Sequence, residues 1–466
     1  MRTAFAPRAD RHYRILLMLL LCAQLAYMVI YIAPPPGQVT MAADPNTRLI
    51  KLALLALGTA VVLSRWQVAR RLLKEMNRFL LLFMALAVLS LVWSIDRSVT
   101  AARLVTLASM VMTCFAFGAG AWNPRRFQDV VRPAISLVLI ASLIIGVIDP
   151  NLVTEVGNTI SLKDAWRGLT AQKNVFGELA SFGAILWLHA GLARQVRGWR
   201  ALAGAGIALT CLILSRSSTS LFCTAYAAVF LIILARSGPA MRRYMPYVVA
   251  AFTGMSVLYV LAIMNVVPGI ERILIDPVLS LTGKSLTFSG RTVIWQIVGW
   301  NIGRHPYLGS GYGAYWGAGP VPSSPSYAFI RLMWGFWPTE AHNGYLDIRN
   351  DLGDAGLACL VAYIGAYILQ CVRLYRFDRA QAALFLAFLF QQVLLNLSES
   401  TWLNVNNFCF TIMTVATVMI SRALNEHSRA SRVAGAEANA RRTGFAGIRI
   451  PRAWSEPTPS PRDGST

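Results

Sequence analysis

His342 is the residue whose type and setting are best suited to chemistry. It lies in the run Glu340-Ala341-His342-Asn343-Gly344-Tyr345-Leu346-Asp347, which closes a polar segment from about Pro268 to Asp351. A long loop is uncommon unless it has a function, and a histidine can exchange a proton near neutral pH. A loop histidine taken alone is more often structural, so its function depends on its neighbours. No second His or Cys stands at metal-ligand spacing from His342, so no metal is expected.

Two residues that follow His342 are candidate substrate-binding residues. If the run is helical, Tyr345 shares one face with His342, and Asn343 lies on the next face. Gly353 is expected to end this helix before the next apolar run begins.

Arg291 is the second candidate catalytic residue, in the run Ser289-Gly290-Arg291-Thr292-Val293-Ile294-Trp295. Ser289 suits a helix N-cap, and the run predicts an amphipathic helix near the membrane surface that ends near His305-Pro306. A cation in the first helical turn opposes the helix dipole. Its presence there indicates that Arg291 serves as an anion ligand. The apolar stripe of this helix consists of Val293, Ile294, Ile297, Val298 and Ile302.

A further polar group surrounds the start of the apolar run near residue 175. Its candidates for binding pyrophosphate or glycan are Arg167, Lys173, Asn174, Glu178 and, from a short turn between later apolar runs, Arg216. An ionisable side chain such as Glu178 inside an apolar stretch is a functional candidate by default. The alternative is that Lys173 extends toward the membrane surface and that Glu178 only pairs with it or with an arginine.

These residue types suit the transfer of a sugar from a lipid pyrophosphate. Arginine binds phosphate oxygens bidentately and stays charged, so it can match the charge of the leaving group without a metal. A histidine with a pKa near the working pH can take the proton of the acceptor hydroxyl. No cofactor is expected.

The elements that must position these residues are membrane helices. The chain has 466 residues, of which 56% are hydrophobic and 14% charged, against about 25% charged in a soluble domain. Its net charge of +22 is explained by basic loops on the cytoplasmic side, so nucleic acid is not an expected partner.

Twelve apolar runs predict an all-α integral membrane protein with about twelve transmembrane helices. One re-entrant hairpin around Ser215–Thr219 is the alternative for two of them. Residues 1–267 would hold the first nine helices, 268–354 one large loop with amphipathic helices, 355–421 the last three helices, and 422–466 a disordered tail. The runs are approximately 15–33, 49–64, 79–93, 104–122, 133–149, 175–193, 200–215, 218–235, 246–267, 355–373, 381–397 and 403–421.

The distribution of basic residues predicts the orientation. Most Lys and Arg fall in the N-terminus, the tail and the loops on their side of the membrane. Both termini are therefore expected to be cytoplasmic and the large loop periplasmic, in a bacterial inner membrane.

The motifs together resemble the O-antigen ligase and Wzy-type polysaccharide polymerase superfamily. The matching pieces are Ser289-Gly290-Arg291 with Trp295, the turn from Pro306 to Gly313, and the segment from Glu340 to Gly353. Arg167-Gly168 followed by Lys173-Asn174 and Gly177 looks like the motif of the ExoQ-like exopolysaccharide polymerase branch. The resemblance implies a metal-independent glycosyltransferase with a GT-C-like helical fold. In that family pattern Arg291 and Arg167 would hold pyrophosphate, and His342 would assist the acceptor.

The expected function is polymerisation of undecaprenyl-pyrophosphate-linked oligosaccharide units into exopolysaccharide or O-antigen at the periplasmic face. The alternative is a ligase that moves the lipid-linked glycan onto lipid A core or protein. Two readings from other classes are a polysaccharide or lipid transporter and a non-catalytic assembly subunit. The expected partners are the lipid-linked donor, a glycan or lipid A core acceptor and membrane lipid, with a flippase and a chain-length regulator left open.

Overall fold

The computed structural model describes residues 11–30, 45–120, 126–155, 164–238, 243–263, 291–317 and 338–442, with Gly269, Tyr327 and Phe329. Within these ranges the fold is helical. The only extended pairing there is a single antiparallel bridge between Thr154 and Trp166. The expected all-α membrane class is confirmed, because the apolar runs form helices whose backbone groups are bonded within each segment.

A helix coincides with each of the twelve apolar runs. The first ten helices are α1 (Arg11–Val29), α2 (Pro45–Ser64), α3 (Trp66–Leu72), α4 (Arg78–Leu89), α5 (Arg97–Ala119), α6 (Arg126–Ile148), α7 (Lys173–Leu192), α8 (Gly198–Leu214), α9 (Ser218–Arg236) and α10 (Met245–Ile263). The later helices are α13 (Arg291–Arg304), α14 (Ala314–Gly317), α16 (Gly344–Tyr375), α17 (Arg379–Leu395) and α18 (Phe408–Arg442).

Not all of these helices are long enough to cross a membrane by themselves. Among the described residues, seven are long and apolar enough, or eight if α2 and α3 form one span bent by 92°. Four apolar helices, including α8 and α17, are shorter. The total of twelve spans therefore stays a prediction, as does the side of the membrane on which each end lies.

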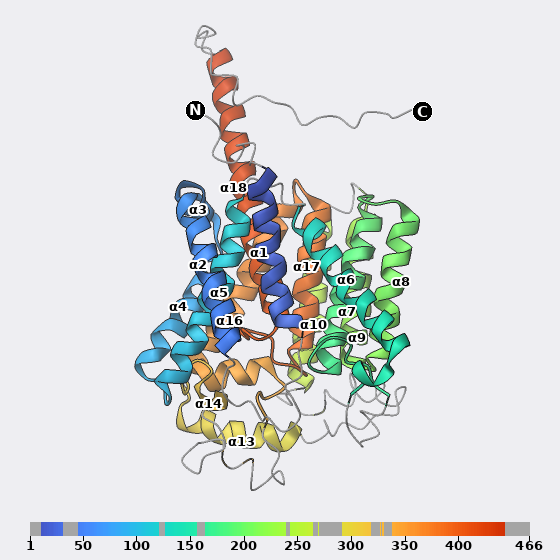
Figure 1. Ribbon diagram of the computed structural model, residues 1–466. Coiled ribbons are helices and arrows are strands. Elements are labelled where there is room, and N and C mark those ends of the chain that lie inside the picture. The colour runs from blue at the N-terminus through green and yellow to red at the C-terminus, as the bar shows by residue number, and fades with distance from the viewer. Residues whose placement is uncertain are drawn as a thin grey trace.

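The long helices lie side by side as a bundle, and α13 and α14 cross one end of it (Figure 1). At the opposite end α18 projects beyond the other helices (Figure 1). The apolar stripe of α13 faces inward, since Ile294, Ile297, Val298 and Ile302 are all buried. The amphipathic helix predicted from the sequence is thereby confirmed, although Ser289 and Gly290 lie outside the described residues.

The centre of the bundle is formed by α17 and the apolar part of α18. Every residue of α17 from Gln381 to Leu395 is buried, and the apolar window of α18 is buried throughout. The segment between these two helices, residues 396–407, therefore lies at one end of the two central helices and supplies a main part of the candidate site.

Two segments test the expected boundaries. The backbone of α16 breaks at Gly353, with φ 65°, as the sequence predicts, so a short helix from Gly344 precedes the long one. By contrast, α18 continues to Arg442. The disorder expected from Arg422 onward is wrong for residues 422–442, because this stretch is rich in alanine and arginine, which are strong helix formers. Residues 443–466 lie outside the described part.

Candidate active site

Most of the loop between α17 and α18 is buried, from Asn396 to Leu403, and side chains of the loop bond several of its backbone groups. Asn396 Oδ1 accepts hydrogen bonds from the backbone N–H groups of Thr401 at 2.9 Å and Trp402 at 3.0 Å. From outside the loop, the Tyr312 hydroxyl donates to the carbonyl of Leu403 at 2.5 Å. Because its polar backbone groups have partners, this loop can lie in the interior without a large desolvation cost.

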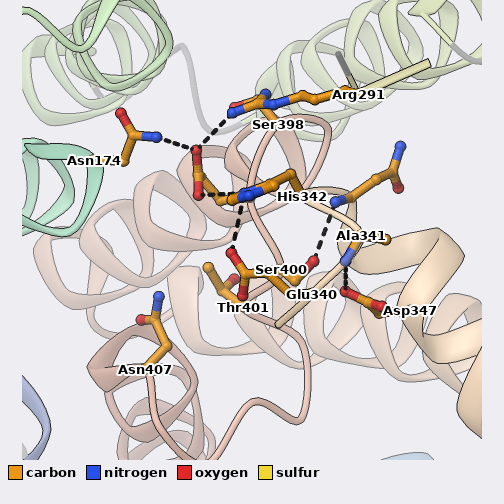
Figure 2. Close-up of polar contacts among 12 residues, drawn as sticks. Asn174, Arg291, Glu340, Ala341, His342, Asp347, Ser398, Ser400, Thr401 and Asn407 are labelled. Atoms are coloured by element: carbon orange, nitrogen blue, oxygen red, sulfur yellow. Dashed lines mark hydrogen bonds and ion pairs between the residues drawn. The ribbon is translucent and has the colours of Figure 1, made fainter. Parts of the chain in front are cut away.

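Glu399 on this loop is the point at which three predicted residues meet. Its Oε1 accepts a hydrogen bond from Asn174 Nδ2 at 2.7 Å and one from Arg291 Nη2 at 3.1 Å (Figure 2). Its Oε2 lies 3.5 Å from Nδ1 of His342. The Glu399 side chain is only 7% exposed, so these groups form a compact, largely buried charged centre.

His342 lies just before α16 in a left-handed backbone conformation, with φ 50°. This conformation is uncommon for a residue with a side chain and persists only where the surroundings enforce it. Nδ1 lies 3.2 Å from Glu340 Oε1, and the side chain is 22% exposed. Since Nδ1 faces the carboxylates, Nε2 is the ring nitrogen left to meet a substrate.

The two carboxylates make His342 a cation. Burial by itself lowers the pKa of His342, but the interactions with Glu340 and Glu399 outweigh burial and raise that pKa to about 10. The expectation of a histidine that titrates near the working pH is therefore wrong. At neutral pH the resting form is an imidazolium ion.

The segment that carries His342 is fixed by α13 and α16. Trp295, one turn after Arg291 on α13, donates through Nε1 to the carbonyl of Ala341 at 3.0 Å. Asp347 accepts the N–H of Ala341 at 3.0 Å. The same helix, α13, thus carries Arg291, which contacts Glu399, and Trp295, which holds the backbone next to His342.

Asn343 and Tyr345 form hydrogen bonds with protein groups outside the Glu399 centre. Asn343 is the N-cap of α16, and its Oδ1 accepts from the N–H groups of Tyr345 at 3.1 Å and Leu346 at 3.2 Å. Tyr345 donates its hydroxyl proton to the carbonyl of Val393 at 2.8 Å. The expected helical face shared by His342 and Tyr345 is wrong, because α16 begins only at Gly344.

Arg167 is not part of the Glu399 centre. Its guanidinium donates to the backbone carbonyls of Thr154 at 3.2 Å, Thr170 at 3.3 Å and Leu152 at 3.0 Å. Arg216 lies at a neighbouring turn, 3.9 Å from Asp164 and 53% exposed. The cations that the sequence groups together are therefore divided between separate sets of contacts.

Lys173 and Glu178 flank Asn174 on α7 and have different surroundings. The backbone N–H of Lys173 donates to Glu155 Oε1 at 2.5 Å, where α7 begins. Glu178 is buried and accepts from Asn407 Nδ2 at 3.0 Å and from Cys409 Sγ at 3.3 Å. Glu178 thereby ties α7 to the end of the buried loop, and these contacts do not support the alternative that Glu178 only pairs with Lys173 or an arginine.

Three of these groups could also hold a metal ion. Nδ1 of His342 and one carboxylate oxygen each from Glu340 and Glu399 lie within 4.8 Å of one another. Imidazole and carboxylate ligands in such a set suit several divalent metals. The sequence did not suggest this set because Glu399 is remote from the other two residues. The expectation of no metal stays a prediction.

Glu399 and Glu340 are the site residues that motif reasoning missed as functional groups. Glu340 was noted only as part of the His342 run. Glu399 lies in the polar stretch Asn396-Leu397-Ser398-Glu399-Ser400-Thr401. A carboxylate among hydroxyl and amide residues between two apolar runs is the signal that could have drawn attention to it.

Comparisons with known proteins cover much of this site. Residues 203–361 match a family model described as O-antigen ligase, a range that includes Arg216, Arg291 and His342. The chain is also similar to the exopolysaccharide production protein ExoQ of Rhizobium meliloti (strain 1021), with 28% identity over 255 residues. This alignment covers 52% of the chain and 56% of the relative, so the chain spans about half the length of the curated relative that it matches.

Proposed function

We propose a function from the premise that this chain is a relative of the O-antigen ligases and ExoQ-like exopolysaccharide proteins, a resemblance on which its motifs, the matching family model and the similarity to ExoQ agree. This family implies a glycosyltransferase-type activity on lipid-linked glycans. The finer proposal is that the chain polymerises undecaprenyl-pyrophosphate-linked oligosaccharide units without a metal.

The convergence of Arg291 and His342 on the carboxylates of Glu399 and Glu340 is the observation that carries the proposal. Two cations and two carboxylates within a few ångströms balance one another in this centre. An incoming pyrophosphate can replace the carboxylates as partner of the cations, since arginine pairs with phosphate as readily as with carboxylate. Substrate binding would then release a carboxylate for proton transfer.

The proposed reaction is a single displacement at the anomeric carbon of the donor sugar. The acceptor hydroxyl oxygen forms a bond to that carbon, and the bond from the carbon to the phosphate oxygen breaks. Its electron pair leaves with the lipid pyrophosphate, whose charge Arg291 and the His342 imidazolium match. The acceptor proton passes to Glu340, whose side chain is 19% exposed against 7% for Glu399.

The remaining candidate residues have supporting parts in this proposal. Asn174 orients Glu399, and Glu178 fixes the loop that carries it. Asn343 and Tyr345 hold the start of α16. Arg216, which is half exposed, would meet the distal phosphate or the glycan, together with Lys173.

The proposed setting is the inner membrane of a bacterium, with both termini in the cytoplasm and the end of the bundle near α13 facing the periplasm. The basic loops at the other end support this orientation. A flippase that delivers the donor and a regulator of chain length would be partners in the same membrane.

A ligase is the second candidate, favoured by the description of the matching family model. It would use the same donor and the same displacement, and only the acceptor would differ. A transporter accounts less well for a compact set of cations and carboxylates at one end of the bundle.

The test is the identity of the product. Purified full-length protein in nanodiscs would be supplied with lipid-linked oligosaccharide, with and without lipid A core. A ladder of lipid-linked polymer without core supports the polymerase, and transfer only onto core supports the ligase. His342→Ala, a change that leaves the backbone bonds at Ala341 in place, should abolish either product. Unchanged product from a correctly folded variant would refute the assigned role of His342.

A further inference from the structure

A second group of cations lies at the same end of the bundle, on the side formed by α2 and α5. Arg48 and Lys51 lie in the first turns of α2, and Arg103 lies in the second turn of α5. Arg48 and Arg103 are the charged groups that act on Lys51, and both repel it. Within the described ranges none of the three lies within 4.0 Å of an acidic group, although Arg103 interacts electrostatically with the buried carboxylate of Asp351.

The position of these cations is defined by their packing. The Lys51 ammonium lies 5.6 Å from the centre of the Tyr27 ring. Arg103 packs against Gly313, where an added Cβ would lie 2.8 Å from Arg103 Cδ and 2.9 Å from Nε. A larger residue at 313 would therefore displace the arginine. Lys51 and Arg103 are half-buried, and Arg48 is exposed.

This cationic group borders the surface that faces lipid. Leu49, Ile50 and Leu52, which alternate with the cations along α2, are 68%, 45% and 52% exposed. Apolar side chains with this exposure on a membrane helix contact lipid tails. A lysine repelled by two neighbouring arginines beside such a surface fits a lipid whose headgroup carries phosphate.

Tyr312 connects this group to the catalytic loop. Its carbonyl accepts from the Thr100 hydroxyl at 3.1 Å on α5, and its own hydroxyl donates to Leu403 in the loop that carries Glu399. Arg291 and Asn174 approach Glu399 from α13 and α7 instead. The first cationic group thus contacts the loop directly, and the second is linked to it through α5 and Tyr312.

We propose that Arg48, Lys51 and Arg103 bind the phosphate groups of the acceptor, a second lipid-linked glycan, while Arg291 and His342 hold the donor. The inference rests on the proposed function and makes it more specific. A polymerase that joins two lipid-linked molecules must hold two pyrophosphates apart while their sugars meet. Two separate phosphate sites, one in contact with the catalytic loop and one linked to it through Tyr312, meet that requirement.

The test compares two acceptors with the full-length protein in nanodiscs that lack anionic phospholipid. One acceptor is the lipid-linked oligosaccharide, and the other is the same oligosaccharide without lipid or phosphate. Lys51→Gln with Arg103→Gln should raise the KM for the lipid-linked acceptor by about 10- to 100-fold, the loss expected for two charge-assisted contacts. The rate with the soluble acceptor should stay unchanged.

The matched control is Arg97→Gln, which removes an exposed cation from the same end of α5. It should leave both acceptors unaffected. An unchanged KM for the lipid-linked acceptor in the double variant would overturn the inference while leaving the proposed function standing. Equal loss with both acceptors would also overturn it, and would assign the cations to membrane phospholipid or to folding. No transfer by the wild-type protein to either acceptor would instead contradict the proposed function.

Discussion

Arg291 and Arg167 are both arginines that motif reasoning assigned to pyrophosphate, and the structure gives them different surroundings. Arg291 reaches a buried carboxylate, Glu399, that other polar groups share. Arg167 is surrounded by the carbonyls of its own segment. A carboxylate partner can be exchanged for a phosphate of similar shape and charge, whereas three backbone carbonyls are lost only if the segment unfolds. The difference teaches that an arginine's partner, more than its motif, indicates whether it can receive a substrate.

The largest effect is expected from Arg291→Ala. Transfer should fall by at least about 10³-fold, because the variant loses charge stabilisation of the leaving group at the reacting centre. Membrane insertion and elution in size-exclusion chromatography should stay normal. The matched control is Arg304→Ala, at the exposed end of the same helix, which should retain full activity. If Arg291→Ala still made substantial polymer, Arg291 would be no more important for transfer than Arg167 is expected to be.

A change of pH should separate the roles of His342 and its carboxylates. If the imidazolium is the working form, activity should hold through neutral pH and fall as the pH passes about 10, the raised pKa of His342. In Glu340→Gln the rate should drop at every pH, because the proposed proton acceptor is lost. The fall of the remaining rate should begin at lower pH, because one carboxylate that stabilises the imidazolium is gone. A rate that rises steadily toward pH 10 would instead identify neutral His342 as the general base.

The same raised pKa bears on stability. Since the folded-state pKa lies above the ordinary value of 6.5, protonation of His342 stabilises the fold fully below about pH 6.5, and this contribution disappears as the pH rises through about 10. The melting temperature should therefore decline over that range, and His342→Gln should decline less.

Gly344→Ala tests how rigidly the centre is held. A Cβ at this position would collide with Oδ1 of Asn396, the residue that organises the buried loop. We expect a loss of about 1–3 kcal/mol in stability from overpacking, together with reduced activity. Gly365→Ala, later in α16 where the space is open, should be neutral or slightly stabilising. Equal melting temperatures for the two variants would show that the loop adapts.

Substitution of Arg167 should lower the stability of the protein more than its transfer activity. Arg167→Lys keeps the charge but cannot reproduce three hydrogen bonds from a planar guanidinium. The melting temperature should drop by a few degrees, while the KM for donor changes by less than about threefold. A large rise in that KM with unchanged stability would return Arg167 to the pyrophosphate site.

The smallest effect is expected from treatment with EDTA, which should leave transfer unchanged. A loss of transfer that a divalent metal restores would instead favour Glu340, His342 and Glu399 as metal ligands.

Much of the architecture could be predicted from the sequence because membrane helices can be recognised by the length and apolar content of their sequence. The break at Gly353 and the inward stripe of α13 followed from backbone chemistry and periodicity. The site could be predicted only in part. Arg291, Asn174 and His342 were identified by residue type and motif, but their meeting at Glu399 depends on packing between helices distant in the chain.

The raised pKa of His342 could not be predicted from the sequence for the same reason. It depends on Glu399, which comes close only through the burial of the loop after α17, and no local pattern around His342 indicates it. Likewise, the sequence cannot distinguish an arginine that binds carbonyls from one that binds phosphate, because the donor groups are the same.

The burial of the loop at residues 396–407 has a consequence for amide hydrogen exchange. Loops generally exchange their amide protons with solvent quickly, since their backbone groups are exposed. Here the N–H groups of Thr401 and Trp402 are bonded to Asn396 between two buried helices. They should therefore be protected like those of a helix interior, so that the segment carrying Glu399 would open only when the surrounding core opens with it.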